Sequence, residues 1–118
     1  MLKSKVKEIG ELVEAFEEEM LLILFGPSAT EELKSICVIH ETLDTKKNVL
    51  SPGTAIQFGD TSYKITKVGN AANQNFDELG HVSIYFQEGD NEILPGAISV
   101  EPSIYPKLAI GDMIKIGG

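Results

Sequence analysis

The chain contains two histidines, and these are the side chains best suited to covalent chemistry near neutral pH. His40 follows the apolar, strand-favouring run Ile36–Ile39 and precedes a polar loop that closes at Pro52 and Gly53. An imidazole has an ordinary pKa of about 6.5, so a useful fraction of it is uncharged and nucleophilic at neutral pH. A histidine at the end of a strand can be held by that strand and still reach solvent. The sequence therefore indicates His40 as the chemical centre.

The chemistry that suits such a residue is the reversible uptake of a phosphoryl group. A phosphorylated ring nitrogen is a high-energy phosphoramidate, which fits a relay in which the group must leave again. Phosphoryl transfer depends mainly on positioning and on charge stabilisation. It would add roughly two negative charges, which backbone N–H groups of the polar loop could bind. The residues alone favour a structural alternative, in which His40 ends a strand and bonds a backbone carbonyl.

His81 is the second candidate site residue. It follows Gly80 and opens the alternating segment 81–87, in which Val82, Ile84 and Phe86 face one way. One interpretation makes His81 a supporting hydrogen-bond partner of the His40 ring or of the bound phosphate. The other makes it an ordinary histidine at the start of a strand. Both interpretations stay open.

Three further features of the sequence bear on phosphate, metal and cofactor binding, and each is a weaker indication than the two histidines. Lys46 and Lys47 follow His40 in the same loop and could attract phosphate, although a solvated loop tip is the favoured interpretation. Cys37, His40 and His81 could suggest zinc, but strand alternation puts Cys37 and His40 on opposite faces and no Cys-x-x-Cys accompanies them. We therefore expect no metal site. The sequence holds no P-loop or Gly-x-Gly-x-x-Gly pattern, so we expect no nucleotide or other cofactor.

Length and composition narrow the class of protein. The chain has 118 residues, which predicts a single domain over 1–118. Its formal net charge is −8 and its ten basic residues are all lysine, which argues against a nucleic-acid partner. The longest apolar run, Met20–Phe25, is far too short to span a membrane, and no apolar targeting segment follows the start. A single cysteine cannot form an internal disulfide, which favours the cytoplasm.

The order of elements predicts a mainly β fold. Strand patterns occupy 3–9, 21–25, 36–39, 54–58, 61–68, 81–87, 97–101 and the end of the chain near 108–116, and helical patterns occupy 11–19, 28–34 and 76–79. Short strands separated by Gly, Pro and Asp turns indicate a small closed β-barrel of about six to seven strands with two or three short helices. A β-sandwich is the competing architecture.

Several short motifs in a fixed order carry a resemblance that covers nearly the whole chain. They are Cys-Val-Ile-His at 37–40, Leu-Ser-Pro-Gly at 50–53, Val-Gly at 68–69, Glu-Leu-Gly-His-Val at 78–82 and Leu-Pro-Gly at 94–96. With these motifs the chain resembles the glucitol/sorbitol-specific enzyme IIA component of the bacterial phosphoenolpyruvate-dependent sugar phosphotransferase system.

The resemblance implies a phosphoryl carrier. Members of this family accept the group from a phosphorylated histidine carrier protein and pass it to the IIB domain of a glucitol/sorbitol permease during sugar uptake. The family's phospho-accepting histidine matches His40, and no cofactor is implied. Contact with the membrane is expected only through the IIB/IIC components of the permease. The alternative function is a non-catalytic β-barrel adaptor or sugar-binding module in which both histidines are structural.

Overall fold

The computed structural model describes residues 1–44, 46–88 and 92–117. These contain eight strands, two short α-helices and one 3₁₀-helix, η1. The strands are β1 (Leu2–Ile9), β2 (Leu21–Phe25), β3 (Val38–Thr42), β4 (Ala55–Phe58), β5 (Thr61–Val68), β6 (Val82–Phe86), β7 (Ala97–Glu101) and β8 (Met113–Ile116). The helices are η1 (Val13–Glu19), α1 (Glu31–Lys34) and α2 (Ala72–Leu79). None of the described helices is long and apolar enough to cross a membrane.

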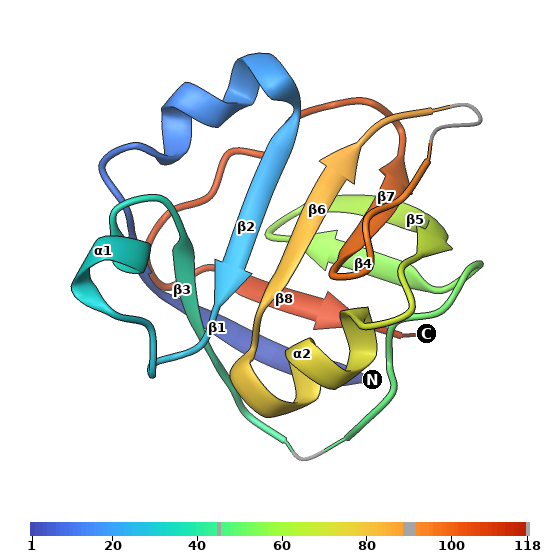
Figure 1. Ribbon diagram of the computed structural model, residues 1–118, viewed down its shortest axis with the longest axis horizontal. Coiled ribbons are helices and arrows are strands. Elements are labelled where there is room, and N and C mark those ends of the chain that lie inside the picture. The colour runs from blue at the N-terminus through green and yellow to red at the C-terminus, as the bar shows by residue number, and fades with distance from the viewer. Residues whose placement is uncertain (45, 89–91, 118) are drawn as a thin grey trace.

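The strands close into one barrel in the order β1-β3-β2-β6-β7-β5-β4-β8 (Figure 1). The pairs β2–β3 and β6–β7 are parallel, and the remaining neighbours are antiparallel. Closure gives every described strand a neighbour on both sides, so the barrel has no free edge. The predicted closed barrel is confirmed over the alternative sandwich. The predicted number of about six to seven strands is slightly too low, because the described residues contain eight.

The period-two pattern of the strands directs apolar side chains into the barrel. Along β6 the side chains of Val82, Ile84 and Phe86 are buried, as the alternation predicts. Phe86 makes edge-to-face contacts with Phe58, Tyr63 and Tyr105, with ring centroids 6.0, 5.0 and 5.6 Å away. This aromatic group stabilises the core, because edge-to-face ring pairs contribute free energy beyond the area that they bury.

Helix α2 covers the end of the barrel at which β6 begins (Figure 1). It starts at Ala72, four residues before the predicted helical turn 76–79, and ends at Gly80 in the left-handed conformation (φ 69°). The extra turn lies in a polar segment, 69–75, that has turn composition. Its inner side buries Ala72 and Phe76, and this packing stabilises a helix that local propensity does not specify.

Truncation of Phe86 tests the packing of the aromatic core. We expect Phe86→Ala to lower the free energy of unfolding by about 3–5 kcal/mol, because the side chain is buried and touches three other rings. Urea denaturation followed by circular dichroism measures the change. Leu94→Ala is the control, since Leu94 is exposed and its truncation should change stability by about 0.5 kcal/mol or less. Equal shifts for the two variants would contradict this description of the core.

Candidate functional site

The ring of His40 lies inside the barrel end, not at its surface. Strand β3 alternates so that Val38 and His40 share the inner face, and His40 pairs with Val6 of β1. The side chain is only 1% exposed. The expectation that this residue reaches solvent is therefore wrong. The covering chain comes from the α2–β6 connection, about forty positions later in the sequence, and local patterns cannot reveal such a contact.

One ring nitrogen of His40 is held by Ser4 of β1. The distance between Ser4 Oγ and His40 Nδ1 is 2.5 Å, and Ser4 is fully buried. Ser4 is a site residue that the sequence analysis missed. The signal was present, because Lys3, Lys5 and Lys7 alternate along one face of the strand and therefore turn Ser4 to the inner face. A polar residue on the apolar face of a strand needs a partner.

The other ring nitrogen determines where the proton sits. His40 Nε2 lies 2.7 Å from the carbonyl oxygen of Gly80. A carbonyl only accepts, so Nε2 carries the hydrogen and donates it. In the neutral ring, Nδ1 then keeps its lone pair and accepts the hydroxyl hydrogen of Ser4. Burial lowers the pKa of His40 below its ordinary value of 6.5, and the hydrogen bond to Gly80 opposes this shift only in part. The site therefore holds a neutral imidazole of defined tautomer.

Two glycines let the backbone close over this ring. The Gly26 amide donates to the carbonyl of Leu79 at 2.8 Å, so the segment after β2 crosses the end of α2. A Cβ on Gly80 would lie 2.9 Å from Gly26 N and 3.2 Å from His40 Nε2. Any larger residue at position 80 would push the two segments apart or strain the positive φ. We call this contact of Gly26 with Leu79 and Gly80 the glycine crossing.

The ring of Phe76 covers a flat side of the imidazole. Its centroid lies 5.6 Å from that of His40, and the two planes are nearly parallel at 15°. Phe76 is buried on the inner side of α2. The His40 ring is thus fixed in its plane by Ser4 and Gly80 and across its plane by Phe76.

His81 lies next to the glycine crossing but does not bond the His40 ring. Its Nδ1 donates to the carbonyl of Leu24 at 3.1 Å, and its ring packs on Phe25 with centroids 4.7 Å apart. The His40 ring instead forms hydrogen bonds with Ser4 and with the Gly80 carbonyl. A role for His81 toward a bound phosphate stays a prediction.

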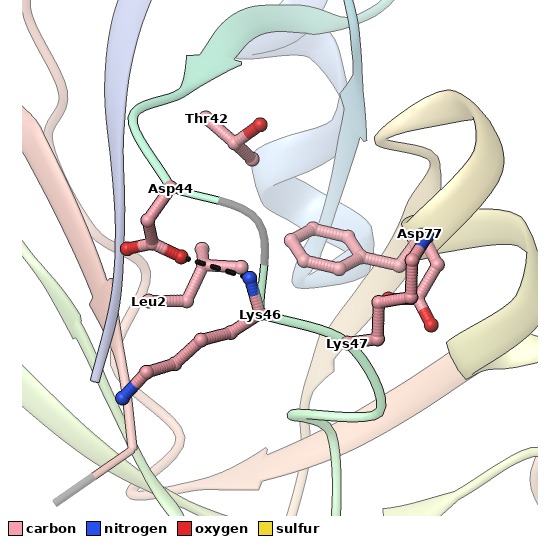
Figure 2. Close-up of a pocket in the computed structure, with 7 residues that line it drawn as sticks. Leu2, Thr42, Asp44, Lys46, Lys47 and Asp77 are labelled. Carbon is pink, nitrogen blue, oxygen red and sulfur yellow. Dashed lines mark hydrogen bonds between the residues drawn. The ribbon is translucent and has the colours of Figure 1, made fainter.

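Lys46 and Lys47 line a pocket of about 250 Å³ at the same end of the barrel (Figure 2). Leu2, Thr42, Asp44, Phe76 and Asp77 complete its lining. Two carboxylates and two lysines line it, so the formal charges of the lining cancel and the pocket has no net positive charge. Backbone hydrogen bonds, first from Lys3 and then from Lys46, lower the pKa of Asp44. Figure 2 shows the Lys46 side chain extending away from Thr42, which fits the predicted solvated loop.

Cys37 belongs to a different environment from His40. It packs with Phe25, Ala29 and Ile39 in a small cluster outside the main core, and burial raises the pKa of its thiol to about 11. Across residues 1–44, 46–88 and 92–117, no group of three or more His, Cys, Asp or Glu side chains could hold a metal ion.

The fold and the site together define a small closed β-barrel with one buried, neutral imidazole that is held by hydrogen bonds at both ring nitrogens. Comparison with known proteins gives its family. Residues 1–115 match the family model of the PTS system glucitol/sorbitol-specific IIA component. The chain is 32% identical over 103 residues to the glucitol/sorbitol-specific EIIA component of Escherichia coli, covering 87% of this chain and 82% of that protein. It is 29% identical over 113 residues to the corresponding Shigella flexneri component, covering 96% and 91%.

A solved structure supports the same assignment. The crystal structure of a PTS system IIA component from Enterococcus faecalis matches with a TM-score of 0.90 and 31% identity, covering 98% of this chain and 99% of that one. The chain belongs to the glucitol/sorbitol-specific IIA family of the phosphotransferase system, and it is a phosphotransferase component.

The buried neutral ring predicts a pH dependence of stability. Because the pKa of His40 is lower in the folded chain than its ordinary 6.5, the unfolded chain binds more protons between the two values. The stabilisation is complete above the unfolded value and is lost as the pH falls toward the folded value. Urea titrations between about pH 7.5 and about pH 5.5 should show this loss. His40→Gln should flatten the slope, and equal slopes in the wild type and His40→Gln would contradict the shift.

Proposed function

We propose that this protein accepts a phosphoryl group on His40 from a phosphorylated histidine carrier protein. It then passes the group to the IIB domain of a glucitol/sorbitol permease during sugar uptake. The observation that carries the proposal is the His40 imidazole, neutral by burial, fixed in one tautomer by the Gly80 carbonyl and held at its other nitrogen by Ser4. A neutral ring offers the lone pair that phosphoryl transfer needs. Membership of the IIA family supports the role of phosphoryl carrier.

The sugar and the partners in this proposal come from the relatives. The Escherichia coli and Shigella flexneri proteins are named as glucitol/sorbitol-specific components. Selection of the sugar would rest largely with the permease, because this chain handles only phosphate. The net charge of −8 favours partners with positively charged faces and makes the encounter sensitive to salt. The proposed location is the cytoplasm, with which the buried free thiol of Cys37 is compatible.

Phosphoryl transfer to His40 requires a local opening of the closed site. The ring is 1% exposed and both nitrogens are engaged, so an in-line donor cannot reach it in this arrangement. On the Nε2 side, the backbone of the glycine crossing covers the ring. Opening it would break the hydrogen bond of Gly26 to Leu79 and that of His40 to Gly80. Leu79, which is 41% exposed, lies at this crossing and offers a partner an apolar contact.

Labelling with phosphate tests the acceptor. The protein is incubated with phosphoenolpyruvate, enzyme I and the histidine carrier protein. We expect acid-labile, alkali-stable label on the wild type, no label on His40→Ala, and label with slower onward transfer on His81→Ala. Mass spectrometry locates the modified residue. His81 is less buried than His40, which makes it the second candidate acceptor.

The two single variants separate these candidates. Label that persists in His40→Ala and disappears in His81→Ala would move the acceptor to His81. An unlabelled wild type, with a known carrier labelled in the same mixture, would overturn the phosphoryl-carrier proposal.

Amide hydrogen exchange tests the opening. The Gly26 amide should exchange through a local fluctuation, at a free energy well below that of global unfolding, because the crossing involves only one strand end and one helix end. Hydrogen-bonded amides of β6 and β7 serve as the global reference. If Gly26 is protected as strongly as these strands, access to His40 by this route is excluded.

A further inference from the structure

We propose that Ser4 is a positioning residue that holds His40 through Nδ1 in both stages of the reaction by reversing its hydrogen bond. In the closed site the hydroxyl donates to Nδ1. When Nε2 carries the phosphoryl group, the same hydroxyl accepts a hydrogen from Nδ1. This inference rests on the proposed function, since it assumes His40 as acceptor, and it names the residue that prepares the ring for attack.

The two nitrogens differ in what stands in front of them. Nδ1 faces Ser4, whose side chain is fully buried. Ser4 lies on a strand that is paired on both sides, opposite Thr42 of β3 and Ile114 of β8. A phosphoryl donor cannot approach from that direction without opening the barrel. Nε2 faces only the carbonyl of Gly80 at the glycine crossing. The reacting nitrogen is therefore Nε2.

The closed tautomer is the wrong one for this attack. Nε2 donates to Gly80 and so carries a hydrogen, whereas the nucleophilic nitrogen must present a lone pair. The proton must therefore move to Nδ1 when the crossing opens. A partner of Nδ1 that could only donate would oppose this change, and one that could only accept would oppose the closed tautomer. A hydroxyl serves both, because it is a donor and an acceptor at once.

The reaction balances with water as the only further participant. As the site opens, Nε2 releases its proton to water and Nδ1 gains one from water, so the ring stays neutral. The Nε2 lone pair then forms the new N–P bond, and the His40 ring, which keeps its Nδ1 hydrogen, becomes cationic beside the doubly negative phosphoryl group. The donor is a phosphohistidine whose other ring nitrogen is protonated, so its ring becomes neutral when its N–P bond breaks and the electron pair returns to it. Ser4 Oγ now accepts the Nδ1 hydrogen and keeps the ring plane in line with the donor.

Nitrogen NMR of the wild-type protein with ¹⁵N-labelled histidine gives the first test. Before phosphorylation the proton should lie on Nε2 and the lone pair on Nδ1. After phosphorylation, coupling to phosphorus should appear at Nε2 and the proton at Nδ1. Coupling to phosphorus at Nδ1 would overturn the proposal, and this measurement needs no variant.

Removal of the hydroxyl gives the second test. We expect Ser4→Ala to slow phosphorylation of His40 about tenfold, the effect of losing one buried hydrogen bond. The phosphorus should still appear on Nε2, and the proton of the unphosphorylated ring should stay on Nε2, because the Gly80 carbonyl still accepts it. The NMR resonance of Nδ1 should shift, because Nδ1 loses its hydroxyl hydrogen bond. Ser99→Ala is the matched control, because Ser99 is also a buried serine on a barrel strand and is 4% exposed. It should keep the wild-type rate and tautomer.

The outcomes separate this inference from the proposed function. A wild type that is not phosphorylated on His40 sinks the proposed function itself. A wild type phosphorylated on His40, together with Ser4→Ala that reacts at the Ser99→Ala rate or leaves the Nδ1 resonance unchanged, overturns the role of Ser4 alone. If Ser4→Ala does not fold, the wild-type nitrogen assignment decides.

Discussion

The hydrogen bond from His40 Nε2 to the Gly80 carbonyl is the interaction on which the rest of the site depends. An imidazole removed from water is costly unless both nitrogens are satisfied, and the carbonyl fixes which nitrogen donates. Ser4 must then supply the second bond, from the opposite side of the ring. The two hydrogen bonds of one side chain therefore connect three distant parts of the chain, namely β1, β3 and the end of α2. The neutral charge state of the ring follows from the same burial.

The barrel and the glycine crossing have opposite mechanical roles. The closed sheet holds Ser4 and His40 on paired strands, so the geometry of the Nδ1 side changes only if the barrel itself opens. The Nε2 side is covered by the end of an eight-residue helix and the segment after β2, joined by the Gly26 amide and the Leu79 carbonyl. Local opening costs much less than global unfolding where few contacts are lost. A ring that must be shielded from water and also reached by two partners in turn gains from this asymmetry.

The sequence predicted most of the fold, because strand periodicity and turn residues are local signals. The alternation of Val82, Ile84 and Phe86 and the barrel architecture are confirmed. Two features were missed for different reasons. The first turn of α2 is specified by burial of Ala72 and Phe76 and not by helix-favouring composition. The burial of His40 depends on a contact with Gly80, forty positions away, which no single-sequence pattern encodes. Ser4, by contrast, was detectable: three alternating lysines mark the outer face of β1 and leave this serine inside.

The two partners of the His40 ring divide its control between them. A backbone carbonyl accepts only, so Gly80 stabilises one tautomer and one position of the crossing, and the bond is lost when either changes. A hydroxyl both donates and accepts, so Ser4 can bond the ring in either tautomer and adds little to the difference between them. The energetic difference between the closed and the reactive site is thereby concentrated on the Nε2 side, at the surface that a partner protein can contact. A group at position 4 that could only donate or only accept a hydrogen bond would itself favour one tautomer of His40. Part of the energetic difference between the closed and the reactive site would then arise in the barrel interior, which a partner protein cannot contact.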